Sequence, residues 1–154
     1  DALRFFYIDK ALSTHMDLDL NIMKEQSNNN PVYYVQYAHA RIQGVFEKAT
    51  EKYGKINFVN SFKTINLETI KPLCQQLSLY PQIIEEIAVK RNVHKITHYL
   101  YELASLLHSY YNDEKIITDN IDETFEKLTV LQAVKTVISD ALSLIGVSAP
   151  NHME

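Results

Sequence analysis

Residues 30–41 read Asn-Pro-Val-Tyr-Tyr-Val-Gln-Tyr-Ala-His-Ala-Arg, and this stretch does most to define the fold. Asn30 is a favourable N-cap, and Pro31 suits the first position of a helix. Apolar residues then recur at helical spacing, which predicts one long helix from residue 31 to about 53, ended by Gly54. Its buried stripe is formed by Val35, Ala38, Ile42, Phe46 and Ala49.

The same helix carries a second face. Tyr34, Tyr37 and Arg41 stand at i, i+3 and i+7, so they share one side of the helix. At about 100° per residue, this side lies roughly 110° from the apolar stripe. Flat rings beside an arginine suit unpaired bases of single-stranded nucleic acid. By itself, however, aromatic spacing of this kind is more typical of packing.

Helical periodicity continues along the chain and predicts an all-α helical bundle. Further helices are expected over residues 1–12, 17–26, 67–79, 80–90, 93–111 and 123–145. The break at residues 80–81 is expected because proline disrupts a helix interior. Gly146 is expected to cap the last helix, and residues 57–66 and 112–122 should connect helices. The inward positions of the last two helices are Ile96, Leu100, Leu103, Leu107, Leu128, Leu131, Val134, Ile138, Leu142 and Ile145.

Composition narrows the class of protein. With 154 residues, 46% of them hydrophobic, the chain can form one self-sufficient domain. The single cysteine, Cys74, excludes an internal disulfide and a multi-thiolate zinc site, and is expected to be buried among leucines. No apolar run reaches membrane-spanning length, and the acidic start does not resemble a secretory signal. We therefore expect a protein of the reducing cytoplasm.

The net charge of −4 is unevenly distributed. Residues 41–71 hold six basic and three acidic residues, whereas residues 113–126 hold six acids and one lysine, Lys115. Recognition of a few unpaired bases needs fewer phosphate contacts than binding of a duplex, so the charge neither favours nor excludes a nucleic-acid partner.

Several motifs resemble one family. The stretch at residues 30–41 resembles the motif that opens the anticodon-binding domain of bacterial-type, class I arginyl-tRNA synthetases. Asp1-Ala2-Leu3-Arg4 resembles the segment that gives this DALR-type domain its name. The other matching stretches are residues 15–20, 24–27, 99–104, 110–112 and 144–150. The resemblance therefore runs from the first residue to the last.

The resemblance implies a division of the chain and a parent activity. Residues 1–26 would form the connection from the end of the catalytic half, and residues 27–154 the helical anticodon-binding domain. The parent enzyme would be an arginine-tRNA ligase that uses ATP with Mg²⁺. Its partners would be the anticodon loop of arginine tRNA and the catalytic domain of the same chain, and it is expected to be a monomer. Because the sequence begins at Asp1 without an initiator methionine, we expect a fragment of a longer protein.

Five site residues follow from the resemblance, namely Tyr34, Tyr37, Arg41, Tyr111 and Met153. Each has a structural alternative. The tyrosines of the long helix could cover the core with their hydroxyls in water, and Arg41 could pair with Glu47. Tyr111 could belong to the core, and Met153 lies in a tail.

The chain also departs from the family. The usual ending is Pro-Glu-Arg-Met, whereas this chain ends Pro150-Asn151-His152-Met153-Glu154, so an arginine is lost and Met153 is not terminal. Many relatives have an arginine before the leucine of the last helix, where this chain has Glu126-Lys127-Leu128.

Catalytic signatures are missing from the sequence. Neither the His-x-Gly-His nor the Lys-Met-Ser-Lys-Ser motif of class I synthetases is present, and no glycine-rich phosphate loop occurs. His94 and His98 form an i, i+4 pair without an evident third metal ligand. His108 stands near Ser105 and Ser109 without a nucleophile motif. We expect no cofactor in the fragment and no aminoacylation by it alone.

A second class of function stays open. The acidic net charge and the acidic connection at residues 113–126 are also typical of a non-catalytic helical protein-interaction module.

Overall fold

A computed structural model describes residues 1–11, 13–17 and 19–153. Within these residues the secondary structure is entirely helical, which confirms the all-α prediction. The helices are α1 (Ala2–Ile8), α2 (Leu20–Lys24), α3 (Pro31–Tyr53), α4 (Leu67–Lys90), α5 (His94–Asp113) and α6 (Ile121–Leu144). The expected helices over 1–12 and 17–26 are shorter than predicted, and their positions at Leu12 and Leu18, like the final Glu154, lie outside the described residues.

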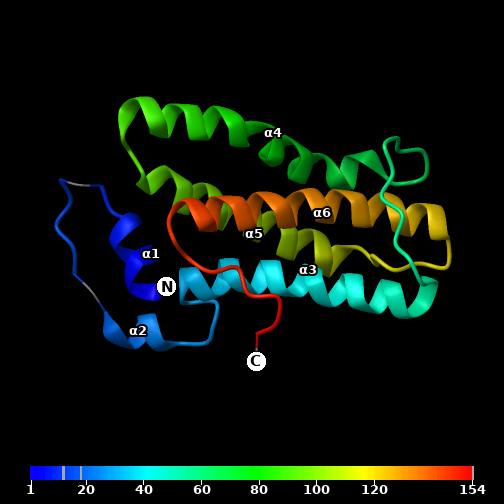
Figure 1. Ribbon diagram of the computed structural model, residues 1–154, viewed down its shortest axis with the longest axis horizontal. Coiled ribbons are helices and arrows are strands. Elements are labelled where there is room, and N and C mark those ends of the chain that lie inside the picture. The colour runs from blue at the N-terminus through cyan, green and yellow to red at the C-terminus, as the bar shows by residue number, and fades with distance from the viewer. Residues whose placement is uncertain (12, 18, 154) are drawn as a thin grey trace.

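Four long helices form the bundle. α5 and α6 pack against each other, and each also contacts α3 on one side and α4 on the other (Figure 1). The short α1 lies across one end of the bundle, where it contacts α3 and α5, and α2 contacts α1. The site predicted on α3 is therefore carried by one of the bundle's four main helices.

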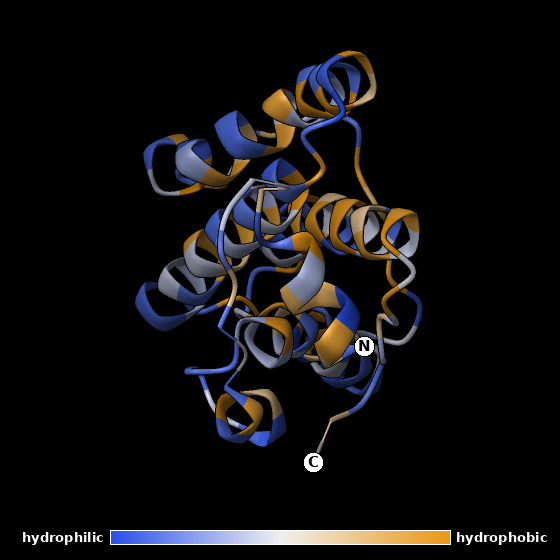
Figure 2. Ribbon diagram, turned by 90° about the vertical axis from the view of Figure 1, so that its left-hand side faces the viewer, coloured by the Kyte–Doolittle hydropathy of each residue, from blue (hydrophilic) through white to orange (hydrophobic). Residues whose placement is uncertain are grey.

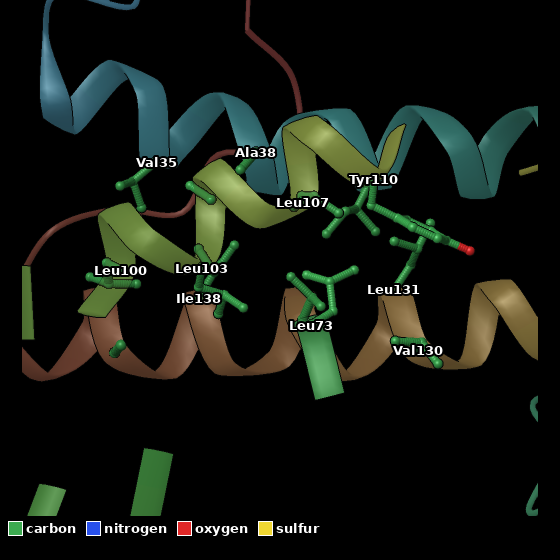
Figure 3. Close-up of a cluster of buried hydrophobic side chains, with 14 of the residues drawn as sticks. Val35, Ala38, Leu73, Leu100, Leu103, Leu107, Tyr110, Val130, Leu131 and Ile138 are labelled. Carbon is green, nitrogen blue, oxygen red and sulfur yellow. The ribbon is translucent and has the colours of Figure 1, made fainter. Parts of the chain in front are cut away.

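The core lies where α5 meets α3 and α6. Figure 3 shows Leu100, Leu103 and Leu107 of α5 pointing toward side chains of these neighbours. The predicted inward positions are all buried, which confirms the helical register of α3, α5 and α6. Burial of such aliphatic side chains contributes about 1.5–3 kcal/mol each relative to exposure.

The ends of α3 agree with prediction, but the cap at its start does not work as expected. Gly54 ends the helix with a positive φ of 75°, and its N–H donates to the carbonyl of Thr50. Asn30 occupies the N-cap position, yet its side chain makes no capping bond. Its amide instead donates to the carbonyls of Met23 and Glu25, at 3.3 and 2.9 Å. Asn30 thus ties the preceding turn to α3.

The predicted break at Pro81 is wrong, because α4 is one helix from Leu67 to Lys90 with Pro72 and Pro81 inside it. Pro81 is exposed, whereas apolar residues on both sides of it pack on the core. Tyr80 is anchored just before the proline, since its hydroxyl donates to Asp140 and its ring lies 5.4 Å from that of Tyr99. Tertiary packing on both sides outweighs the lost backbone hydrogen bond.

Other expectations about burial are only partly met. Phe5 of α1 is 1% exposed and joins the core, whereas Tyr7 of the same helix is 54% exposed. Cys74 is exposed rather than buried, which corrects the prediction: the side of α4 that faces the core carries Ile70, Leu73 and Leu77.

No long helix in the described part of the chain is uniformly hydrophobic. Figure 2 shows hydrophilic and hydrophobic residues interleaved along the helix ribbons. Among the described residues, we find no helix with both the length and the apolar character needed to cross a membrane.

Candidate nucleic-acid interface

Helices α3 and α5 bring four of the five predicted site residues together. Tyr34, Tyr37 and Arg41 come from α3, and Tyr111 comes from the last turn of α5. The guanidinium carbon of Arg41 lies 3.6 Å from the centroid of the Tyr111 ring. It lies 5.9 Å from the centroid of the Tyr37 ring. A cation over an aromatic face is attracted to it, so the two tyrosines help to fix the position of the guanidinium.

Arg41 does not form the ion pair considered above. Within the described residues, no carboxylate lies within 4 Å of its guanidinium. Glu47 instead accepts a hydrogen bond from Gln43 at 2.9 Å and lies 3.5 Å from His152. The positive charge of Arg41 is therefore left available to a negatively charged or electron-rich ligand.

His108 of α5 lies at the centre of the group, and no sequence pattern singled it out for this role. Its ring centroid is 4.6 Å from that of Tyr34 and 5.7 Å from that of Tyr37, with the second pair stacked at 24°. Its Nδ1 lies 3.2 Å from a terminal nitrogen of Arg41. Burial lowers the pKa of His108 from its ordinary value, and the nearby Arg41 charge lowers it further.

Tyr37 is the most open ring of the site. The Tyr33 ring lies next to it, parallel to the Tyr37 ring within 4° at a centroid distance of 6.1 Å. At that separation parallel rings are strongly offset and overlap only in part. Tyr37 is 37% exposed, so part of its ring remains accessible to a ligand.

Tyr34 and Tyr111 have a mixed role. Both are half-buried and packed against the core, so the structural alternative is correct for part of each ring. Tyr110, rather than Tyr111, is the residue buried in the core at the end of α5 (Figure 3). Tyr111 thereby presents its face to Arg41 while resting on the bundle.

A surface hollow of about 250 Å³ lies beside this group of side chains, and we call it the α3–α5 hollow. It is lined by Asn28, Tyr34, Tyr37, Arg41, Ser105, His108, Ser109 and Asn112. Rings, amides, hydroxyls and one guanidinium are the groups that hold unstacked bases and their edges. Asn28 belongs to the turn before α3, so the interface includes a loop as well as two helices.

The fifth predicted residue, Met153, is held separately. After Gly146, the C-terminal tail crosses α3 (Figure 1). Gln36 donates to the carbonyl of Ser148 at 2.9 Å, and His39 donates through Nδ1 to that of Pro150 at 2.8 Å. Met153 is half-buried beyond these contacts and is not among the residues that line the hollow.

The departure at Glu126-Lys127 has a structural role. The Glu126 carboxylate accepts hydrogen bonds from the backbone N–H groups of Lys63, Thr64 and Ile65, at 2.8–3.2 Å. Burial alone would raise the pKa of Glu126, but these donors outweigh it and the pKa is lowered. Lys127 is buried against Glu114 and Glu123 at 3.1 and 2.8 Å. Neither side chain is free to meet a ligand.

The paired histidines of α5 do not indicate a metal centre. His94 and His98 pack edge to face at 5.8 Å, and His98 lies 3.6 Å from Asp9. No cluster of three or more metal-ligating side chains occurs among the described residues.

Comparisons with known proteins identify a matching family. The DALR anticodon binding domain family matches residues 35–153. An arginine–tRNA ligase of Staphylococcus aureus (strain USA300) is 40% identical over 153 residues, covering 99% of this chain and 28% of that protein. The chain thus spans less than a third of the length of this relative. The relative from strain MRSA252 has the same identity and coverage.

Two solved structures have the same fold. A putative arginyl-tRNA synthetase from Campylobacter jejuni aligns with a TM-score of 0.83 at 30% identity, over 99% of this chain and 33% of that one. The arginyl-tRNA synthetase of Thermus thermophilus aligns with a TM-score of 0.79 at 23% identity, over 99% and 26%. The architecture is therefore that of an all-helical synthetase domain. The chain belongs to the DALR anticodon-binding domain family.

Proposed function

We propose that this chain recognises the anticodon loop of arginine tRNA and positions the tRNA for aminoacylation by the catalytic part of an arginyl-tRNA synthetase. The observation that carries the proposal is the convergence of Tyr34, Tyr37 and Arg41 on one hollow, with the Tyr111 ring packed against the Arg41 guanidinium. Arg41 stands over the Tyr111 ring there without a carboxylate partner among the described residues. The family match and the names of the relatives support the choice of tRNA.

Each residue has a distinct part in this proposal. Tyr37, the most exposed ring, stacks on an unpaired base. Arg41 meets a base edge or phosphate with its planar fork while its other contacts hold it in place. Tyr34 lines the hollow and the Tyr111 ring lies against the Arg41 guanidinium, so both help to orient these two. Met153, at the end of the tail across α3, approaches the loop from outside the hollow.

The parent activity is part of the same proposal. ATP and Mg²⁺ would be bound by the catalytic part of the enzyme, which this sequence does not include, and the chain would act in the cytoplasm as part of a monomeric protein. The division at residue 26 also belongs here. Phe5 packs into the bundle core, so residues 1–26 would connect the two halves through a helix that is already docked.

The alternative of a protein-interaction module rested on the acidic connection between α5 and α6. Most of those acids have partners within the chain: Asp119 pairs with Lys52 at 2.9 Å, and Glu114 and Glu123 pair with Lys127. The Glu126 carboxylate accepts hydrogen bonds from the backbone of residues 63–65. Little unpaired negative charge is therefore left for a partner protein. We therefore favour tRNA recognition.

A gel-shift experiment tests this choice. The purified chain is titrated with arginine tRNA and with the same tRNA carrying a swapped anticodon. Tighter binding of the arginine anticodon supports the proposal. Equal binding of both would mean that the chain does not read the anticodon, and absence of binding would favour the protein-interaction module.

A further inference from the structure

His108 is buried at 8% exposure and contacts Tyr34, Tyr37 and Arg41, the three predicted site residues that line the α3–α5 hollow. Packing alone would be enough to explain a buried imidazole in such a place. Its hydrogen bonds indicate more than that, because both ring nitrogens point at groups of α3. Nδ1 lies 3.2 Å from Nη1 of Arg41, and Nε2 lies 3.5 Å from the carbonyl oxygen of Tyr34.

The chemistry of these partners fixes the form of the ring. A guanidinium can only donate, so Nδ1 must be the acceptor and carry no proton. The proton then sits on Nε2 and points at the Tyr34 carbonyl, which can only accept. Both contacts are satisfied by the neutral Nε2–H tautomer alone. A protonated ring would direct an N–H and a positive charge at Arg41.

We propose that His108 is the positioning residue of this interface: its neutral imidazole accepts from Arg41 and holds the guanidinium over Tyr111, in the orientation that meets an RNA base. This inference rests on the proposed function. Without the acceptor, the Arg41 side chain keeps its charge but loses the contact that fixes its rotation about the ring stack. The predicted consequence is weaker binding of the unpaired loop, with no change of net charge at neutral pH.

The surroundings of His108 make its protonation costly. α3 faces it with Tyr34, Tyr37 and the cation Arg41, and α5 contributes the neutral Ser105 and Ser109 to the same hollow. The turn before α3 contributes the neutral Asn28. In the described part of the chain, no carboxylate lies within ion-pair distance of the imidazole. Protonation is therefore opposed by Arg41 and assisted by no neighbouring acid, so low pH should disturb the positioning of Arg41.

Two substitutions separate an acceptor from a packing ring. His108→Asn places an amide oxygen near the position of Nδ1, whereas His108→Phe keeps an aromatic ring and removes the acceptor. The probe is a hairpin RNA with the anticodon stem and loop of arginine tRNA, titrated at pH 7.5. Because hydrogen bonds to a charged group are the stronger kind, we expect His108→Phe to weaken binding by about tenfold and His108→Asn by much less. His98→Phe, the same change at an exposed site of α5, is the matched control and should bind as wild type.

The pH profile supplies a second readout that packing would not change. We expect wild-type binding to weaken as pH falls from 7.5 to 5.0, and His108→Asn to lack this weakening. General protonation of the exposed histidines would have the opposite sign, since added positive charge strengthens RNA binding. RNA binding by His108→Phe as tight as that of wild type, or a wild-type profile that strengthens toward low pH, would overturn the proposal. Helix content and melting temperature confirm that each variant is folded.

A measurement without RNA separates this inference from the proposed function. NMR titration of the His108 imidazole should show the Nε2–H tautomer, and Arg41→Ala should raise its pKa toward 6.5. If that coupling is found but the hairpin with the arginine anticodon is not preferred, the proposed function fails and the positioning contact stands. If the hairpin is preferred but Arg41→Ala leaves the titration unchanged, the role of His108 is wrong.

Discussion

Tyr37 differs from the other rings of the interface in combining exposure with support. It is 37% exposed, yet its ring makes stacked contacts with those of Tyr33 and His108, which restrict its movement. A ring that is already fixed loses little conformational entropy when a base stacks on it. The same geometry means that the ring contributes little to the core, because the buried stripe of α3 lies elsewhere on the helix.

Tyr37→Ala should therefore weaken RNA binding without unfolding the chain. We expect a loss of roughly 1–3 kcal/mol in binding free energy, the usual value for one base–aromatic stack. The melting temperature should change little. Fluorescence titration with arginine tRNA and a thermal melt measure the two quantities. Tyr7→Ala, at an exposed ring of α1, is the control; a collapsed melt with unchanged binding would make Tyr37 a structural residue.

Arg41→Lys tests whether the guanidinium acts through its shape. Lysine keeps the charge but has no planar fork to lie over Tyr111 or to meet two acceptors. We expect Arg41→Lys to bind tRNA nearly as weakly as Arg41→Ala at fixed salt. If Arg41 acts only through its charge, Arg41→Lys should bind tRNA nearly as tightly as wild type. The loss of affinity in Arg41→Ala should then become smaller as the salt concentration rises. Titrations of both variants at low and high salt distinguish the cases.

At the scale of single residues, the sequence predicted the site residues of α3 because their spacing places Tyr34, Tyr37 and Arg41 on one face of a helix. It did not find His108, because its role depends on how α5 packs against α3, which spacing within α5 does not reveal. Asn28 was missed for a similar reason, since a loop residue has no periodicity. Lys127 and Glu126 were noted only as departures, although each satisfies several partners within the chain.

At the scale of elements, two side chains of α6 hold the 58–66 segment. Residues 58–66 have no helix of their own, and their backbone depends on partners elsewhere. Glu126 accepts three successive N–H groups there, and the hydroxyl of Thr129 accepts from the N–H of Val59 at 2.9 Å. The loop is thus built onto the first turns of α6, which then positions the start of α4.

Glu126→Gln should loosen this connection. The amide keeps the size of the side chain but replaces one acceptor oxygen by a donor that faces backbone N–H groups. Glu126 is 4% exposed, so solvent cannot fully compensate, and we expect a loss of about 1–3 kcal/mol in the free energy of unfolding. Urea unfolding gives this value. Glu51→Gln, at an exposed carboxylate of α3, should change it by less than about 0.5 kcal/mol, and an equal effect of both would remove the special role of Glu126.

In α4, tertiary packing outweighs the local rule that proline interrupts a helix. Proline is unfavourable inside a helix, and the expected break at residues 80–81 followed from that fact alone. The helix continues because Ile70 and Leu73 on one side, and Ile83, Ile84 and Ile87 on the other, pack on the bundle core. Elements with one uninterrupted apolar stripe, such as α3 and α6, were predicted close to their observed bounds.

At the scale of the whole molecule, two buried histidines link stability to pH. Burial lowers the pKa of both His39 and His108 from the ordinary value of 6.5. A lowered pKa means that the unfolded chain binds the proton more readily, so the fold is favoured fully above pH 6.5 and loses stability as pH falls through the folded values. Lowered carboxylate pKa values, such as that of Glu126, act only below about pH 4.5.

We therefore expect the free energy of unfolding to decrease between pH 7.5 and 5.0. Urea titrations across that range measure the decrease, and the double variant His39→Gln, His108→Asn should show a smaller slope. His15→Gln is the control, since His15 is exposed and its removal should leave the slope unchanged. A wild-type stability that is constant or increases toward pH 5.0 would contradict the assignment of neutral imidazoles in the fold.

The chain termini meet on α3, which sequence reasoning did not anticipate. Gln36 donates to both Asp1 and the Ser148 carbonyl, and Arg4 donates to the Gly146 carbonyl at 3.0 Å. The two contacts with the C-terminal tail link residues more than a hundred positions apart, so no local pattern reports them. They give the helix that carries the interface a second set of restraints, on the side of the tail, in addition to its packing on α5 and α6.

The central claim is that the α3–α5 hollow reads the anticodon, and the most direct measurement combines RNA and protein changes. Wild type and Tyr37→Ala are each titrated with arginine tRNA and with its anticodon-swapped form, which gives four dissociation constants. The account predicts that wild type prefers the arginine anticodon and that Tyr37→Ala loses most of this preference, with little change in its affinity for the swapped tRNA. A substitution that weakens both tRNAs equally, or a preference that survives in Tyr37→Ala, would contradict it.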